Sequence, residues 1–64
     1  MKLDRVCTAL REARDFVVLA DYLIQEAIHK GLRVDRDEIK GKNPASLKRA
    51  SMDLTRALAD MRNG

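Results

Sequence analysis

Apolar residues recur along the first half of the chain with helical spacing. Their separations alternate between three and four residues, with no glycine or proline between them: Leu3, Val6, Leu10, Ala13, Val17, Ala20, Ile24 and Ala27. This heptad stripe predicts one helix over residues 3–30, about 42 Å long at 1.5 Å per residue. Gly31 is the natural residue to end this helix in the left-handed conformation, and Leu32 is placed to contact its last turn.

The same spacing returns in the second half of the chain, in five apolar residues: Leu47, Ala50, Leu54, Ala57 and Met61. Asn43 is suited to the N-cap and Pro44 to the first helical position, so a second helix is predicted over residues 44–62, ended by Asn63-Gly64. In both stripes the large residues alternate mostly with alanine, which lets two helix backbones approach closely. Helices joined by a loop of this length run antiparallel as a rule. The predicted fold is therefore all-α, a single helical-hairpin domain over residues 1–64.

The segment between the two stripes, residues 33–43, carries a weaker signal. Asp35 and Glu38 have the spacing of a capping box, and Val34 and Ile39 have that of a hydrophobic staple. They predict one short helix or 3₁₀ turn near residues 35–40, ended by Gly41. The alternative is a charged loop, because most residues of this segment are charged.

The centre of the first predicted helix is apolar on nearly every side, because Val18, Leu19 and Tyr22 lie outside the stripe. A helix that is apolar all round is normally buried all round, and a chain of this length builds only a marginal core alone. We therefore expect a homodimer in which two hairpins form a four-helix bundle. Six residues are expected to make the self-association surface: Phe16, Val17, Val18, Ala20, Tyr22 and Ile24. The alternatives are a different partner protein, a segment 35–40 that folds back over this face, and ordinary core roles for Phe16 and Tyr22.

Composition places the chain among small, soluble helical proteins. Hydrophobic residues make up 45% and charged residues 36%, which is too apolar for a disordered tail. The longest apolar run, Phe16–Ala20, is far shorter than the ~20 residues that span a membrane. Charged residues at the start of the chain break up any signal-peptide core. We expect a cytoplasmic protein.

No group of residues has the spacing of a catalytic or metal site. A single cysteine excludes a disulfide framework and a Cys-based zinc module, and we expect Cys7 to be a small buried apolar residue. Cys7 and His29 would lie about 33 Å apart on one helix, so one chain cannot pair them as nucleophile and base. Glu26 and His29 match one half of a di-metal motif, without further carboxylates at core positions. We expect no enzymatic activity, no cofactor and no metal.

The excess positive charge lies in the second half of the chain. The 13 Lys and Arg residues exceed the 10 Asp and Glu residues by three, and residues 1–30 are balanced. A basic helix face can follow a phosphate backbone or bind an acidic protein. Pairing of Arg49 with Asp53 and of Arg56 with Asp60 would weaken this field, and no aromatic residue lies between the cations for stacking. Four residues form the candidate face for an anionic partner: Lys48, Arg49, Arg56 and Arg62.

The two helices and their heptad seam resemble the plasmid-copy-number hairpin proteins, which dimerise into antiparallel four-helix bundles and bind paired RNA loops. The resemblance covers helix number, length and seam, and it includes no functional residue. The chain is also similar to the short helical hairpins with which phage and mobile-element proteins disable a host protein. We expect a small regulator or adaptor that self-associates and binds, inhibits or sequesters a larger protein. The alternatives are a basic bundle that binds RNA or DNA through the second helix, an obligate subunit or chaperone of a larger helical assembly, and a bundle that holds a small anionic ligand.

Overall fold

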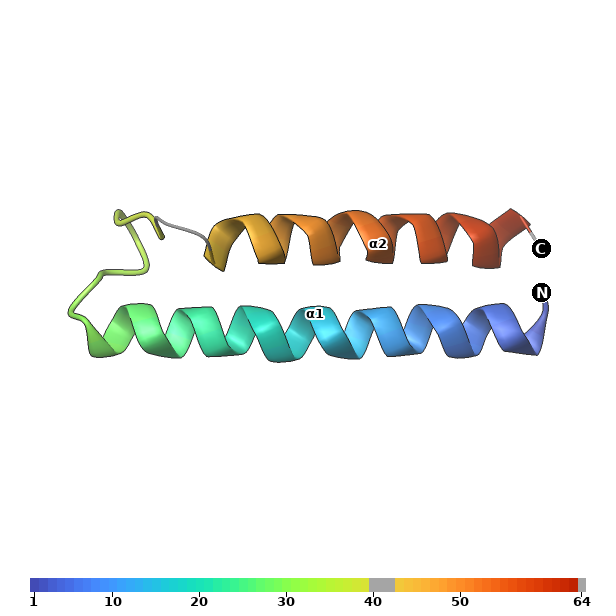
Figure 1. Ribbon diagram of the computed structural model, residues 1–64, viewed down its shortest axis with the longest axis horizontal. Coiled ribbons are helices and arrows are strands. Elements are labelled where there is room, and N and C mark those ends of the chain that lie inside the picture. Colours follow the sequence, from blue (N-terminus) through green and yellow to red (C-terminus); the bar gives the residue numbers. More distant parts are fainter. Residues whose placement is uncertain (40–42, 64) are drawn as a thin grey trace.

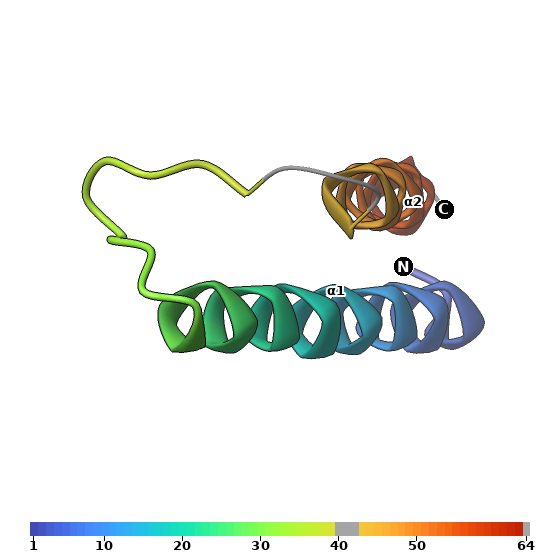
Figure 2. The same ribbon diagram turned by 60° about the vertical axis from the view of Figure 1, so that its left-hand side comes forward.

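The computed structural model is a hairpin of two antiparallel helices, and it describes residues 1–39 and 43–63 (Figure 1). Helix α1 spans Leu3–His29 and helix α2 spans Asn43–Asn63. The described residues contain no strand. The two axes are inclined to each other, since Figure 2 shows α2 nearly end-on while α1 is seen obliquely. The all-helical hairpin is confirmed, with helix ends within one residue of those predicted.

The open end of the hairpin is held by a contact between the two helices. Arg5 donates a hydrogen bond from Nη1 to the backbone carbonyl of Asp60, at 3.1 Å. This carbonyl belongs to the last turn of α2, where no intrahelical N–H is left to satisfy it. The guanidinium also lies at the negative end of the α2 dipole. The first turn of α1 is therefore tied to the last turn of α2, as an antiparallel hairpin requires.

Helix α1 ends in a Schellman motif at the predicted residues. Gly31 has φ of +91°, and its N–H donates to the Ile28 carbonyl at 2.9 Å. The N–H of Leu32 donates to the Ala27 carbonyl at 3.0 Å. These two bonds satisfy carbonyls of the last turn that would otherwise lack partners. The motif sets the direction in which the chain leaves α1.

Replacing Gly31 by alanine is expected to lower the free energy of unfolding by about 1 kcal/mol. No atom lies within 4 Å of an added Cβ, so the cost arises from the left-handed backbone and not from crowding. Urea unfolding followed by helical circular dichroism measures the loss. An unchanged midpoint would mean that the turn readily adopts another conformation, and that it does not fix the path of the loop.

The described part of the segment between the helices, residues 30–39, forms turns at residues 30–31 and 34–36 and no short helix. The N–H groups of Arg36 and Asp37 point to the Arg33 carbonyl, at 3.3 and 2.9 Å. The Asp37 carboxylate accepts a hydrogen bond from the Arg33 N–H at 2.6 Å, and Asp35 pairs with the Arg33 side chain at 3.5 Å. The predicted capping box of Asp35 and Glu38 is therefore wrong, because Asp37 is the carboxylate that reaches back. The alternative of a charged loop is confirmed here.

Three predicted details fall outside the described part of the chain. They are the end of the short segment near Lys40, its stop at Gly41, and the stop of the second helix at Gly64. The cap predicted for the Asn43 side chain also lies outside the described side chains. Helix α2 itself begins at Asn43, directly before Pro44.

The seam on α2 follows the predicted stripe. Leu47, Ala50, Leu54 and Met61 are half-buried and Ala57 is buried. Among the described residues of α2, the large apolar side chains outside this stripe are Leu58, which is half-buried one turn after Leu54, and Met52, which is exposed. The periodicity of this helix therefore predicted which side would face α1.

The seam on α1 uses only half of the predicted stripe. The small residues of the stripe are half-buried, as predicted: Val6, Ala13, Ala20 and Ala27. Its large residues are exposed and lie outside the seam: Leu3, Leu10, Val17 and Ile24. Their place is taken by Ala9, Phe16 and Leu23, one position earlier in each case, of which Ala9 and Leu23 are buried. Both rows keep the three–four spacing to the small residues, so α1 has two possible seams. The hairpin uses the one that contains Ala9, Phe16 and Leu23, and not the predicted one.

The hairpin is a single layer of helices and is long for its mass. Its principal extents are 44 × 19 × 15 Å and its radius of gyration is 14.3 Å, against about 11 Å for a compact domain of this length. Its accessible surface is 5411 Å², whereas a compact monomer of 7.3 kDa exposes about 4,200 Å². The surplus of roughly 1,200 Å² is surface of the helices and of the segment between them that this fold leaves uncovered.

Candidate functional site

One exposed row of large apolar residues runs along α1, and we call it the α1 apolar row. It consists of Leu3, Leu10, Val17 and Ile24, between 46% and 78% exposed. Residues seven positions apart on a helix return to nearly the same side. The row therefore extends over most of the length of α1, beside the seam. Contiguous apolar surface of this kind marks interaction sites in soluble proteins.

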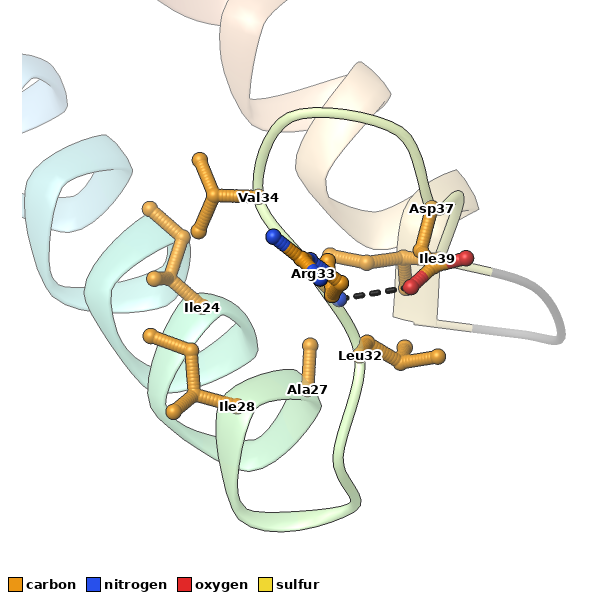
Figure 3. Close-up of a pocket in the computed structure, with 8 residues that line it drawn as sticks. All are labelled: Ile24, Ala27, Ile28, Leu32, Arg33, Val34, Asp37 and Ile39. Atoms are coloured by element: carbon orange, nitrogen blue, oxygen red, sulfur yellow. Dashed lines mark hydrogen bonds between the residues drawn. The ribbon is translucent and has the colours of Figure 1, made fainter.

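An apolar pocket lies where the row meets the loop (Figure 3). Its volume is about 170 Å³. The side chain of Val34 points toward Ile24 in Figure 3, and the hydrogen bond between Arg33 and Asp37 holds the turn that carries it. The pocket suits an apolar side chain, since most of its lining is apolar. Eight residues line it: Ile24, Ala27, Ile28, Leu32, Arg33, Val34, Asp37 and Ile39.

The six residues predicted for self-association do not share one surface. Phe16 and Ala20 are half-buried on the seam side of α1. Val17 and Ile24 belong to the α1 apolar row, and Val18 and Tyr22 are exposed outside it, one helical turn apart. Sequence reasoning missed Leu3, Leu10 and the pocket as parts of the exposed surface. The signal was present in the seven-residue spacing, but that spacing was assigned to the seam with the second helix.

Tyr22, Glu26 and Lys30 follow one another at intervals of four residues along α1. Lys30 Nζ lies 3.1 Å from Glu26 Oε1. Hydrogen bonding from Lys30, together with that from Tyr22, lowers the pKa of the Glu26 carboxyl. The bond to Glu26 in turn raises the pKa of the Tyr22 hydroxyl. Both shifts favour the protonation states already present at neutral pH, a neutral tyrosine hydroxyl and a charged carboxylate.

The remaining candidate chemistry stays dispersed. Cys7 is exposed, so the expectation that it is buried is wrong. It lies next to the exposed row and away from the seam that the hairpin adopts. Within residues 1–39 and 43–63 no three His, Cys, Asp or Glu side chains come together as metal ligands. In that same part of the chain no helix combines the length and the hydropathy needed to cross a bilayer.

All four residues of the candidate basic face, Lys48, Arg49, Arg56 and Arg62, are exposed on α2. The salt bridges that the structure describes join Lys30 to Glu26 and Arg33 to Asp35. The predicted pairs of Arg49 with Asp53 and of Arg56 with Asp60 are not among the contacts of the described residues. The positive charges of α2 are therefore less neutralised by close neighbours than the sequence indicated.

No protein-family model matches the chain, and no curated protein or solved structure shows significant similarity to it. The features from which a function can be inferred are thus those of the hairpin itself: the α1 apolar row, its pocket, the exposed Val18 and Tyr22, and the basic residues of α2.

Proposed function

We propose that the chain is a non-enzymatic interaction protein that self-associates through α1 and binds a larger protein as a regulator or adaptor. The observation that carries this proposal is the α1 apolar row, which α2 leaves uncovered. Removal of apolar surface from water contributes roughly 25 cal/mol per Å². Four large side chains in one line therefore provide a strong driving force for association with another helix.

The surplus surface of the hairpin supports a dimer in particular. Stable interfaces bury about 800 Å² on each partner, and the hairpin exposes roughly 1,200 Å² more than a compact monomer of its mass. One interface of ordinary size therefore fits within the surplus. Two single-layer hairpins stacked face to face make a four-helix bundle, which encloses a core between two layers.

Val18 and Tyr22 supply a contact surface for a larger protein. They lie outside the α1 apolar row, so an interface built on that row leaves them accessible. Tyrosine is among the residues that most often dominate binding energy at interfaces.

Light scattering coupled to size exclusion, on the tag-free chain over a range of concentrations, tests the self-association. We expect twice the chain mass of 7.3 kDa at both low and high salt, because apolar contacts are not screened by ions. A monomer at every concentration would overturn the proposal. Aggregates that become a defined complex only on co-expression with another protein would also overturn it, in favour of the obligate-subunit alternative.

A second candidate function, RNA or DNA binding by α2, is favoured by one observation. Its four exposed cations have no salt-bridge partner among the described residues. Binding of this kind weakens steeply as salt is added. Fluorescence anisotropy with a labelled RNA duplex, at low and at moderate salt, tests it, and absence of binding at low salt rejects it.

A further inference from the structure

A second row of exposed residues runs beside the α1 apolar row. Cys7, Arg14, Asp21 and Ile28 follow one another at intervals of seven, and all four are exposed. With Leu3 in heptad position a, this row occupies position e, where charges set the choice and orientation of partners in coiled coils. Its outer members are weakly polar or apolar, and its inner members have opposite charges. Such a row is complementary to a reversed copy of itself.

From this pattern we propose that a second copy of the chain docks antiparallel on α1, centred near Val17. Arg14 then pairs with Asp21 of the partner subunit, and Asp21 pairs with the partner's Arg14. The apolar pocket at the loop end receives the partner's Leu3. The proposal rests on the self-association proposed above, and it specifies which copy-to-copy contacts produce it.

The charges select this alignment among those available to the row. In an antiparallel pair centred between residues 17 and 18, position 14 lies opposite position 21, and position 7 lies opposite position 28. Leu10 then lies near Ile24 of the partner subunit, and the two Val17 side chains meet at the symmetry axis. An alignment that matched the entire apolar row, with Leu3 opposite the partner's Ile24, would place the two Arg14 side chains together. Like charges so placed are destabilising.

Arg14 and Asp21 are available for such pairs. Both are exposed, and the salt bridges of the described residues join other side chains, Lys30 to Glu26 and Arg33 to Asp35. Two-fold symmetry makes every contact occur twice, so a dimer gains two Arg14–Asp21 pairs. A parallel pair in register would instead set Arg14 level with the partner's Arg14.

In the centred alignment, the pocket covers Leu3, the first residue of the α1 apolar row. Leu3 lies fourteen positions before Val17, about 21 Å along the helix. In the centred pair the partner's Leu3 therefore lies at the height of residues 31–32, next to the pocket formed by Ile28, Leu32 and Val34. The partner's Leu3, which has no residue of the α1 apolar row opposite it in this alignment, therefore meets an apolar pocket.

Charge reversal tests the two pairs. Each of Arg14→Asp and Asp21→Arg is expected to raise the dimer Kd about tenfold, because each variant creates two like-charge contacts. The double variant Arg14→Asp/Asp21→Arg restores both pairs in reversed order, and its Kd should return to within about threefold of the unmodified chain. The matched control is Arg11→Asp/Asp15→Arg, a swap between two exposed residues of α1 outside both rows; its single variants should leave the Kd nearly unchanged.

A double variant as weak as its singles would overturn the proposed alignment. A dimeric mass of the unmodified chain would still support self-association in that case, so the two failures are distinguishable. Sedimentation velocity over a concentration series gives the Kd values, and the circular dichroism of each variant shows that its helices remain folded.

Orientation and register are measured independently with a spin label at position 29. The variant Cys7→Ala/His29→Cys carries one label per chain, at an exposed site outside both rows. The centred antiparallel pair places the two labels about 35 Å apart along the helices. A separation of about 46 Å would indicate the alignment of the entire apolar row, and one below about 20 Å a parallel pair. Either of these results would overturn the proposal.

Discussion

Replacement of Leu23 by alanine is expected to unfold most of the hairpin molecules. Leu23 is 2% exposed, the most covered large side chain in the described part of the structure. Removal of a buried leucine side chain costs about 2–5 kcal/mol, since the cavity that remains is only partly refilled. Domains of this length have total stabilities of about 3–10 kcal/mol, and a single-layer hairpin belongs at the lower end of that range.

Urea unfolding at fixed protein concentration measures this loss, with Met52→Ala as the matched control. Met52 is 61% exposed on α2, so its truncation removes a side chain of similar size without opening a cavity. We expect the control to change the free energy of unfolding by less than about 0.5 kcal/mol. Equal shifts for the two variants would show that Leu23 is not part of the core, and that the seam lies elsewhere on α1.

The different outcomes on the two helices show what periodicity can determine. Helix α2 has one apolar side, so its stripe from Leu47 to Met61 could face only α1. Helix α1 has a row of small residues, such as Ala13 and Ala20, with larger apolar residues on both sides of it. Spacing alone treats the two sides as equal. Which one faces the second helix of the same chain depends on the path of the loop and on the fit between surfaces, and the spacing contains neither.

The loop between the helices shows the same limit at shorter range. Gly31 was predictable because a left-handed backbone conformation is a local requirement that glycine satisfies best. The capping carboxylate was not, because Asp35, Asp37 and Glu38 all lie within reach of the turn. The hydrogen bond from the Arg33 N–H selects Asp37. That selection follows from the conformation of the turn, which the pattern of charges does not determine.

The sequence predicted that α1 would expose apolar side chains, but it did not predict on which side of the helix each would lie. The apolar centre of α1 indicated that one partner helix would leave apolar side chains uncovered, and Val17, Val18 and Tyr22 are indeed exposed. Their division between two sides of α1 needed the structure, because it depends on which side α2 covers. The opposite charges of Arg14 and Asp21 indicate an antiparallel pair only once the α1 apolar row beside them is known to be exposed.

Replacement of Val17 by aspartate is expected to abolish self-association while leaving the hairpin folded. Val17 is exposed in the single chain and lies in the middle of the α1 apolar row, so α2 loses no contact. In a two-fold dimer both copies would bring the new carboxylate to the same apolar centre, where the two like charges meet. Desolvation of a charge costs several kcal/mol and like charges that meet repel, so the Kd should rise at least about a hundredfold.

The matched control is Val18→Asp, which makes the same chemical change at the neighbouring residue, outside the row. We expect it to keep the dimeric mass, measured by light scattering over the same concentrations, and both variants to keep the helical circular dichroism of the unmodified chain.

The reverse result, a monomer for Val18→Asp and a dimer for Val17→Asp, would place self-association on the side of Val18 and Tyr22. The α1 apolar row would then be the surface left for a larger protein. The pair of variants thus determines which side of α1 binds the second copy, because the two residues are adjacent in sequence and differ mainly in the side of the helix on which they lie.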